Sequence, residues 1–160
     1  MCARPLAVID LDGVVADVRH RLHLVREAPR DWDGFFAGIP DDPPLPAGVA
    51  VVRRLATEHD LVYLTGRPER TRAATEAWLV RHSLPLAEVI MRAERDRRPA
   101  RVVKPQLLRR LAAGRWVAVV VDDDPQVCVA LAEDGWPVLQ ADWMPRGEDL
   151  DRAQERLGRT

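Results

Sequence analysis

Short apolar runs alternate along this chain with segments in which apolar residues recur at helical spacing. The runs are rich in Val, Ile and Leu and show no polar alternation, which is typical of strands that are buried on both faces of a sheet. The pattern predicts five strands, at residues 6–10, 61–65, 89–91, 117–121 and, more weakly, 138–140.

The segments between these strands carry the period of amphipathic helices. Pro105 and Pro125 each stand where a first helical residue would lie. Alternating strands and helices predict an α/β fold, a Rossmann-like, three-layer, doubly wound parallel sheet with right-handed crossovers. The predicted helices include residues 49–56, 74–78, 107–111 and 127–131, and a C-terminal helix includes 150–157.

The stretch 16–46 interrupts this alternation. It combines aromatic residues, His20 and His23 with four prolines between residues 40 and 46. We predict a small helical insertion followed by a linker, which is too short to form an independent domain. The whole chain, 1–160, is therefore predicted to be a single domain with a small cap insertion at about 16–46.

The composition is that of a soluble globular protein. Of the 160 residues, 47% are apolar and 31% are charged, and no apolar run approaches bilayer-spanning length. The first residues lack the apolar core of a signal peptide, so we expect a cytoplasmic protein that does not contact a membrane. Two cysteines, Cys2 and Cys128, cannot make a disulfide framework, and Cys128 is expected to be a buried small hydrophobe.

The charge pattern singles out one region and one residue. A net charge of −1 argues against a general electrostatic nucleic-acid binder, but eight basic residues lie between Arg92 and Arg110 against only Glu94 and Asp96. Such a run is usually a solvated face, and it gains interest only beside a phosphate site. Lys104 is the single lysine among 24 basic residues, which makes its compact ammonium a functional candidate.

Acidic residues stand at the predicted end of the first strand, on the edge where open α/β sheets bind ligands. Asp10 ends that strand, and Asp12 follows two residues later in a loop that Gly13 allows. Two carboxylates so close repel each other unless a cation relieves them, and Mg²⁺ prefers such hard oxygen ligands. One aspartate can attack phosphorus and a second can transfer a proton. Taken alone, the segment Asp10-Leu11-Asp12-Gly13 is equally consistent with a plain turn.

Three further groups fall at corresponding positions. Thr65 and Gly66 follow the second strand, where a hydroxyl and free backbone N–H groups suit an anion. Lys104 precedes a predicted helix, and Asp122 and Asp123 follow the fourth strand. Singly, these groups would be a helix cap, a surface lysine and an acidic turn. Together, in the order acid pair, hydroxyl, lysine, acid pair, they predict a magnesium-dependent site for phosphate esters.

This ordered set resembles the haloacid dehalogenase-like (HAD) phosphatase superfamily, from residue 6 to about residue 140. The resemblance implies that Asp10 is the covalent nucleophile and that Asp12 is the general acid and base. It also implies that Thr65 and Lys104 are catalytic groups that bind the phosphate. It also implies a Mg²⁺ site made by Asp10, the carbonyl group of Asp12, Asp122 and, in support, Asp123.

A narrower resemblance is to the 3′-phosphatase domain of phage-type polynucleotide kinase-phosphatases. It implies that Gly66, Arg67 and Arg92 bind the substrate phosphate. The chain departs from it at Ala100, where phage-type enzymes tend to carry an acid, and at Thr65, where serine is usual. The Gly-Lys-Ser/Thr of a kinase Walker A loop is absent. The matching segments are Thr65-Gly66-Arg67-Pro68, Met91-Arg92, Val102-Val103-Lys104 and Asp122-Asp123 followed by Gln126-Val127.

The resulting hypothesis is a magnesium-dependent phosphomonoesterase that works through an aspartyl-phosphate and removes 3′-phosphates from DNA or RNA ends. Nucleotides or other small phosphate esters are the alternative substrates. A phospho-accepting signalling domain is less favoured, because its phosphorylated aspartate would follow the third strand, where Arg92 stands here. A catalytically idle binding domain is disfavoured because no motif residue is missing. The sequence leaves open a homo-oligomeric state and a separate kinase or ligase partner.

Overall fold

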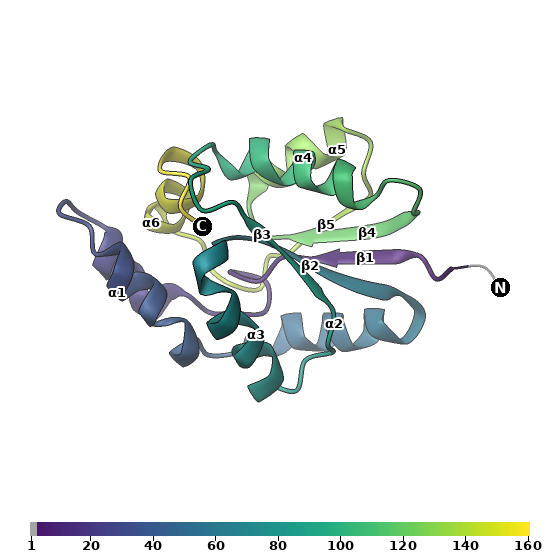
Figure 1. Ribbon diagram of the computed structural model, residues 1–160, viewed down its shortest axis with the longest axis horizontal. Coiled ribbons are helices and arrows are strands. Elements are labelled where there is room, and N and C mark those ends of the chain that lie inside the picture. Colours follow the sequence, from purple (N-terminus) through teal and green to yellow (C-terminus); the bar gives the residue numbers. More distant parts are fainter. Residues whose placement is uncertain (1–2) are drawn as a thin grey trace.

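The computed structural model describes residues 3–160 and contains a parallel sheet between two layers of helices (Figure 1). Its five strands are hydrogen-bonded in the order β3-β2-β1-β4-β5, and all four neighbouring pairs are parallel. The predicted α/β fold is thereby confirmed, with all five predicted strands. They are β1 Leu6–Ile9, β2 Asp60–Pro68, β3 Glu88–Arg92, β4 Val117–Asp122 and β5 Val138–Gln140.

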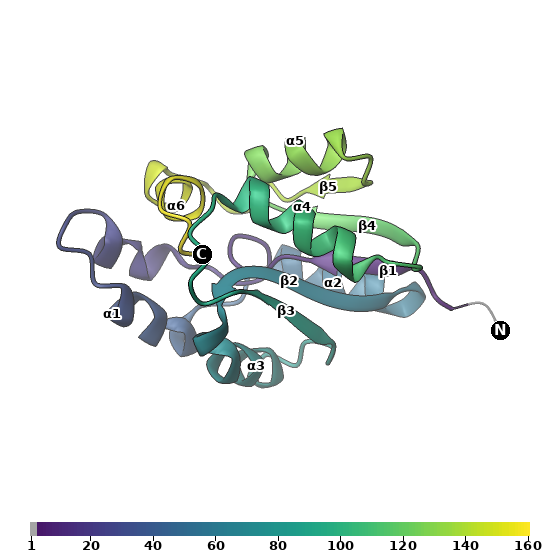
Figure 2. The same cartoon turned by 45° about the horizontal axis from the view of Figure 1, so that its top comes forward.

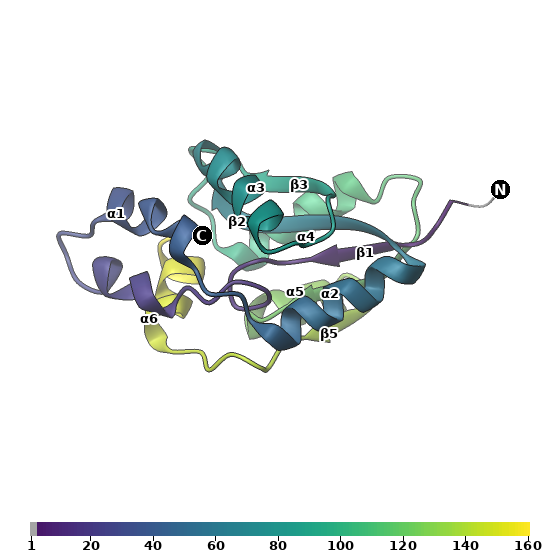
Figure 3. The same ribbon diagram turned by 90° about the horizontal axis from the view of Figure 1, so that it is seen from below.

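Successive residues of the central strand supply opposite faces of the sheet. Ala7 and Ile9 of β1 pack into one apolar cluster with α2 and α3, which lie on the same face (Figure 3). Leu6 and Val8 pack into a second cluster with α4 and α5 on the other face. Burial on both faces explains why this strand has no polar alternation. The helices are α2 Pro46–Glu58, α3 Arg72–Arg81, α4 Ala100–Leu111 and α5 Pro125–Glu133.

The order of the strands creates a crevice at the carboxyl ends of β1 and β4. The chain builds the sheet outward from β1 through β2 to β3, then returns to place β4 against the other side of β1. The connections that leave these two neighbouring strands therefore diverge, and open α/β sheets bind ligands at such a point.

The stretch between β1 and α2 is helical, as predicted. It contains 3₁₀ turns at Arg19–Val25 and Ile39–Asp41 around the short helix α1, Trp32–Ala37. Its apolar residues form a third cluster, which Met144 and Leu150 from the C-terminal part of the chain complete. This insertion and the short helix α6, Glu148–Asp151, lie together beyond the carboxyl ends of the strands (Figures 1 and 2). Its action as a cap stays a prediction.

Helix α4 begins earlier than the sequence predicts. Pro105 was expected at the first helical position, but the helix starts at Ala100 and contains Pro105 in its interior. An interior proline costs roughly 3 kcal/mol, and the burial of Ala100 and Leu108 against the sheet offsets that cost. Lys104 consequently lies inside α4. Pro125 is the first residue of α5, as predicted.

Within residues 3–160, no helix combines the length and the apolar character that crossing a membrane requires. Cys128 is buried in α5, as predicted, and burial raises the pKa of its thiol to about 12. Cys2 lies outside the described residues.

Candidate active site

The carboxyl ends of β1 and β4 bring together three aspartates and the single lysine. Asp10 follows β1, Asp122 ends β4 and Asp123 comes next, and one carboxylate oxygen from each lies within 4.8 Å of the others. The Nζ atom of Lys104 is 3.1 Å from Asp10 Oδ2 and 2.5 Å from Asp122 Oδ2. All four residues are at most 3% exposed. The structure therefore assembles four predicted site residues into one buried cluster.

The chemistry of this cluster fits a divalent cation. Among the described residues, Asp123 Oδ1 is buried without a hydrogen-bond partner, and the contact of Asp10 Oδ2 is its ion pair with Lys104. Burial raises the pKa of Asp10 well above its usual value, and although Lys104 lowers it, the charges of Asp122 and Asp123 raise it further. Two cations, Lys104 and Arg146, leave one negative charge in excess when all three buried carboxylates are ionised, and removing charge from water without compensation costs several kcal/mol. An all-oxygen donor set with an unsatisfied oxygen suits Mg²⁺.

Arg146 holds the outer side of the cluster. Its Nη1 donates to Asp123 Oδ2, and its Nη2 donates to Gln154 Oε1 at 2.9 Å. Burial raises the pKa of Asp123 to about 6, although Arg146 acts to lower it. Arg146 was missed from the sequence because it lies in an irregular segment after β5, with no motif around it.

The carboxylate of Asp12 is directed away from the three clustered aspartates. It accepts hydrogen bonds from Arg67 Nη2 at 2.5 Å, Arg67 Nε at 3.0 Å and Thr160 Oγ1 at 2.9 Å. Burial alone would raise the pKa of Asp12, but Arg67, Arg21 and these hydrogen bonds lower it to about 2. Asp12 is therefore held as a carboxylate. Its predicted contact with the metal, through the backbone carbonyl group, stays a prediction.

A buried charge network links Asp12 to the insertion. Arg67 also donates to Asp42 Oδ2 at 3.0 Å, and Arg21 donates from Nε to Asp42 Oδ1 at 2.7 Å. Arg21 Nη2 lies 3.6 Å from Asp12 Oδ1. Sequence reasoning missed Arg21 and Asp42, because a helical turn and a proline-rich linker both read as solvent-exposed. The network brings an arginine of the insertion to the predicted acid and base.

The carboxyl-terminal end of β2 carries Thr65, Gly66 and Arg67, three of the predicted phosphate-binding residues. The hydroxyl of Thr65 accepts a hydrogen bond from the backbone N–H of Arg67 at 3.2 Å. Arg92 is fully buried, and its Nε donates to the carbonyl of Gly66 at 3.0 Å. Its Nη1 donates to the carbonyl of Arg98 at 2.7 Å, whereas Nη2 has no partner among the described residues. Arg92 thus joins the end of β2 to the loop before α4, and one of its nitrogens is left for a ligand.

The C-terminal segment 157–160 lies over the same edge. The main chain of Thr160 packs against Gly66 so closely that a Cβ there would collide with it. Thr160 is buried, and its hydroxyl reaches Asp12. Residues 158–160 lie beyond the predicted C-terminal helix and carry no motif, so the contact could not be predicted from the sequence. The site is therefore covered by two segments, the insertion and the C-terminal residues.

The basic run between Arg92 and Arg110 does not form one surface. Arg92 is buried, and Arg109 and Arg110 lie at the end of α4 remote from the acidic cluster. The predicted solvated face is thus divided, and only its first half adjoins the site. Besides Lys104, three arginines of the run are held in ion pairs, Arg98–Asp96 at 2.7 Å, Arg101–Glu155 at 2.6 Å and Arg109–Asp134 at 2.6 Å.

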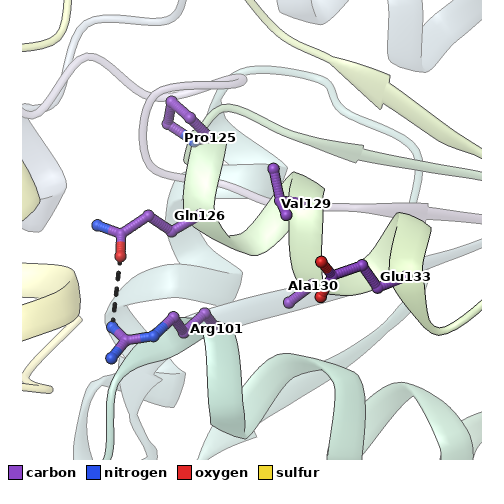
Figure 4. Close-up of a pocket in the computed structure, with 6 residues that line it drawn as sticks. All are labelled: Arg101, Pro125, Gln126, Val129, Ala130 and Glu133. Atoms are coloured by element: carbon purple, nitrogen blue, oxygen red, sulfur yellow. Dashed lines mark hydrogen bonds between the residues drawn. The ribbon is translucent and has the colours of Figure 1, made fainter.

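A surface hollow of about 330 Å³ lies between α4 and α5 (Figure 4). The side chains of Arg101 and Gln126 meet across its rim at 3.5 Å. None of the predicted site residues lines it, so the acidic cluster remains the candidate active site. The lining residues are Arg101, Pro125, Gln126, Val129, Ala130 and Glu133.

Magnesium is expected to stabilise the protein through this cluster. At a hundredfold excess over its dissociation constant, a ligand of the folded state adds ~2.7 kcal/mol, or roughly 5–10 °C in melting temperature for a domain of this size. Asp10→Asn should keep or raise the melting temperature in EDTA, because it removes a destabilised charge, and should reduce the increment that magnesium gives. The surface variant Asp134→Asn serves as the control. Equal increments in all three proteins, measured by calorimetry, would contradict the site.

Comparisons with known proteins cover most of the chain. Residues 5–143 match the family model described as the polynucleotide kinase PNKP phosphatase domain. A chain of the Pnkp1/Rnl/Hen1 complex superposes with a TM-score of 0.72 at 20% identity, over 91% of this chain and 48% of that chain. A haloacid dehalogenase-like hydrolase from Streptococcus pneumoniae gives a TM-score of 0.61 at 15% identity, over 97% and 93%. A search of the curated proteins finds no match.

These two kinds of comparison carry different weight. At 20% identity or below, the structural neighbours support the fold alone, and the chain spans about half the length of the neighbour in the Pnkp1/Rnl/Hen1 complex. The family match covers all the acidic residues of the candidate site, together with Thr65 and Lys104.

Proposed function

Because the chain belongs to the family of polynucleotide kinase PNKP phosphatase domains, among the HAD phosphatases, we propose that it removes 3′-phosphates from DNA or RNA ends with the help of Mg²⁺. The observation that carries this proposal is the buried meeting of Asp10, Asp122 and Asp123 with Lys104. A phosphoryl group bound there would face a nucleophile and a cationic amine at once. The proposed unit is one domain, with residues 16–46 as its cap.

Asp10 is the proposed nucleophile. One of its carboxylate oxygens forms a bond to phosphorus as the bond to the 3′-oxygen of the substrate breaks, which leaves an aspartyl-phosphate and an alcohol. Lys104 neutralises charge on the transferring group. Mg²⁺, held by Asp10, Asp122, Asp123 and the carbonyl group of Asp12, would supply Lewis-acid stabilisation of that charge.

Asp12 is the proposed acid and base. It gives a proton to the departing 3′-oxygen, and it then takes a proton from the water that cleaves the aspartyl-phosphate. The low pKa of Asp12 in its pairing with Arg67 keeps it ionised, which is the form that the second of these steps needs. The first step needs a protonated Asp12, which is favoured when the substrate phosphate draws part of the Arg67 charge toward itself.

The remaining predicted residues orient the phosphoryl group. The proposed ligands of its oxygens are the Thr65 hydroxyl, the backbone of Gly66, Arg67 and the free Nη2 of Arg92. Fixed donors of this kind stabilise the charge that spreads over the equatorial oxygens in the transition state.

Small phosphate esters are the second candidate substrates. They are favoured by the burial of the site, because the insertion and Thr160 leave Asp10, Asp12 and Lys104 nearly inaccessible. A nucleotide would need less opening of these segments than a polynucleotide end.

We also propose a separate partner enzyme. The chain spans about half of its neighbour, whose structure is described as a Pnkp1/Rnl/Hen1 RNA repair complex. A kinase or ligase carried on another chain would complete a repair pathway of that kind. A homo-oligomeric state is equally compatible with the sequence.

The decisive experiment measures phosphate release from matched substrates. Oligonucleotides of DNA and RNA with a 3′-phosphate, the same oligonucleotides with a 5′-phosphate, and 3′-mononucleotides are compared in Mg²⁺ and in EDTA. We expect kcat/KM to be at least about tenfold higher for 3′-phosphorylated ends, a difference of ~1.4 kcal/mol, and to vanish in EDTA. Equal values for mononucleotides would favour the second candidate, and no release from any substrate would reject a phosphatase.

A further inference from the structure

We propose that a patch of Arg70, Arg97, Arg159 and Trp32 beside the active site binds the nucleic-acid strand behind the 3′-phosphate, an inference that rests on the proposed function. We call these four residues the strand patch. The proposal assigns a ligand, single-stranded DNA or RNA, to a surface outside the reacting groups.

The strand patch gathers residues from four parts of the chain. The guanidinium carbon of Arg159 lies 4.7 Å from the centre of the Trp32 ring in α1. Gly158 packs against the carbonyl of Arg97, in the loop between β3 and α4. Arg70 lies over Phe36, whose ring is stacked on Trp32 at 6.1 Å. Figures 1 and 2 accordingly show the C-terminus close to the carboxyl end of the sheet, beside the insertion.

The charges of the strand patch are only partly balanced. Arg70 pairs with Glu94 at 2.6 Å and with Asp33 at 3.5 Å, but Arg97 donates from Nη1 only to backbone carbonyls, including that of Glu94 at 2.8 Å. Within residues 3–160, neither Arg97 nor Arg159 has an acidic side chain at ion-pair distance. Burial, and then the charges of Arg97 and Arg70, lower the pKa of Arg159. A bound phosphate would relieve this repulsion.

The strand patch is continuous with the active site. Thr160, the neighbour of Arg159, touches Asp12, and consecutive Cα atoms are only ~3.8 Å apart. Arg92 links the active site to the strand patch, because it donates hydrogen bonds to the carbonyl groups of Gly66 and of Arg98. A strand whose terminal phosphate reaches Asp10 would thus place its next nucleotide at the patch.

The residue types match single-stranded nucleic acid. Arginines that bind phosphate, next to an aromatic ring on which a base can stack, are the usual combination in sites that hold single strands without reading sequence. Other arginines are less suited, since Arg109 is neutralised by Asp134 at the far end of α4. Arg110, which is exposed at the same end and has no ion pair within residues 3–160, provides a control of equal charge change.

The test measures binding of a fluorescent, unphosphorylated DNA dodecamer to the full chain by anisotropy, over a series of salt concentrations. Arg159→Gln and Arg97→Gln should each weaken binding several-fold and reduce the slope of log K against log salt by about 0.7, the value for one phosphate contact of a single strand. Trp32→Leu should weaken binding about fivefold or more with little change in slope. Arg159→Lys should keep the slope, and Arg110→Gln should match the wild type.

The outcomes separate the strand patch from the proposed function. If the wild type releases no phosphate from 3′-ends but loses DNA binding in Arg159→Gln, the proposed function fails and the strand patch stands. If the wild type is active on 3′-phosphorylated DNA and Arg159→Gln and Arg97→Gln bind DNA as tightly as it does, the strand patch is overturned alone. An equal loss in Arg110→Gln would also overturn it, because net charge would then explain the effect. Melting temperatures and turnover of a 3′-mononucleotide verify that the variants are folded.

Discussion

Replacing Asp10 with asparagine is expected to abolish phosphate release while the fold is retained, a loss on the order of 10⁴-fold or more in kcat. The amide has nearly the shape of the carboxylate but cannot act as the nucleophile. The backbone at this position stays fixed, because the N–H of Asp10 donates to the carbonyl of Val121 at 2.9 Å. Burial and the neighbouring aspartates already disfavour the charged form of Asp10, so stability without metal should not fall.

This expectation is checked by phosphate release from a 3′-phosphorylated oligonucleotide and by mass spectrometry after acid quenching. The wild type should yield a phosphorylated peptide that contains Asp10, and the variant should yield none. Asp134→Asn, which removes a surface carboxylate just after α5, should behave as the wild type in both measurements. Substantial turnover by Asp10→Asn, or a phosphoryl group on another residue, would rule out the covalent scheme.

The part of the site that the sequence predicts is the part that lies at strand ends. Runs of buried residues define where β1 and β4 stop, and a parallel sheet brings those ends to one edge. The proximity of Asp10, Asp122 and Asp123 can therefore be predicted from the sequence alone. The prediction that α4 starts at Pro105 was wrong. Proline favours the first helical position, but the packing of Ala100 and Leu108 against the sheet stabilises a helix that begins earlier.

The part that the sequence does not predict consists of charged residues buried by pairing. Arg21 with Asp42, and Arg146 with Asp123, are separated by 21 and 23 residues, and Thr160 reaches Asp12 across 148. Arginine and aspartate are almost never fully buried unless paired, and pairing depends on how distant segments meet. No periodicity marks these segments. Charge density along the chain was equally uninformative for the run from Arg92 to Arg110, whose members are divided between the end of β3, the loop before α4, and α4 from its first turn to its last.

Lys104→Met is expected to cost both stability and activity. Burial would lower the pKa of Lys104, but the charges of Asp10 and Asp122 raise it, so the ammonium is the positive charge that these carboxylates require. Removing one partner of a buried ion pair costs about 3–5 kcal/mol. Loss of a fixed donor to the transferring phosphoryl group lowers kcat by roughly 10²–10³-fold.

Magnesium separates these two losses. Because it would neutralise the same carboxylates, Mg²⁺ should restore part of the stability of Lys104→Met in urea unfolding, but it should not restore the rate. Lys104→Arg is the matched variant that keeps the charge, and it should recover some stability without activity, since a planar guanidinium cannot occupy the place of a compact ammonium within 3.1 Å of both carboxylates. If Lys104→Met proves as stable as the wild type in EDTA, the carboxylates are not charged together in the metal-free protein. The ammonium would then have no role in balancing them.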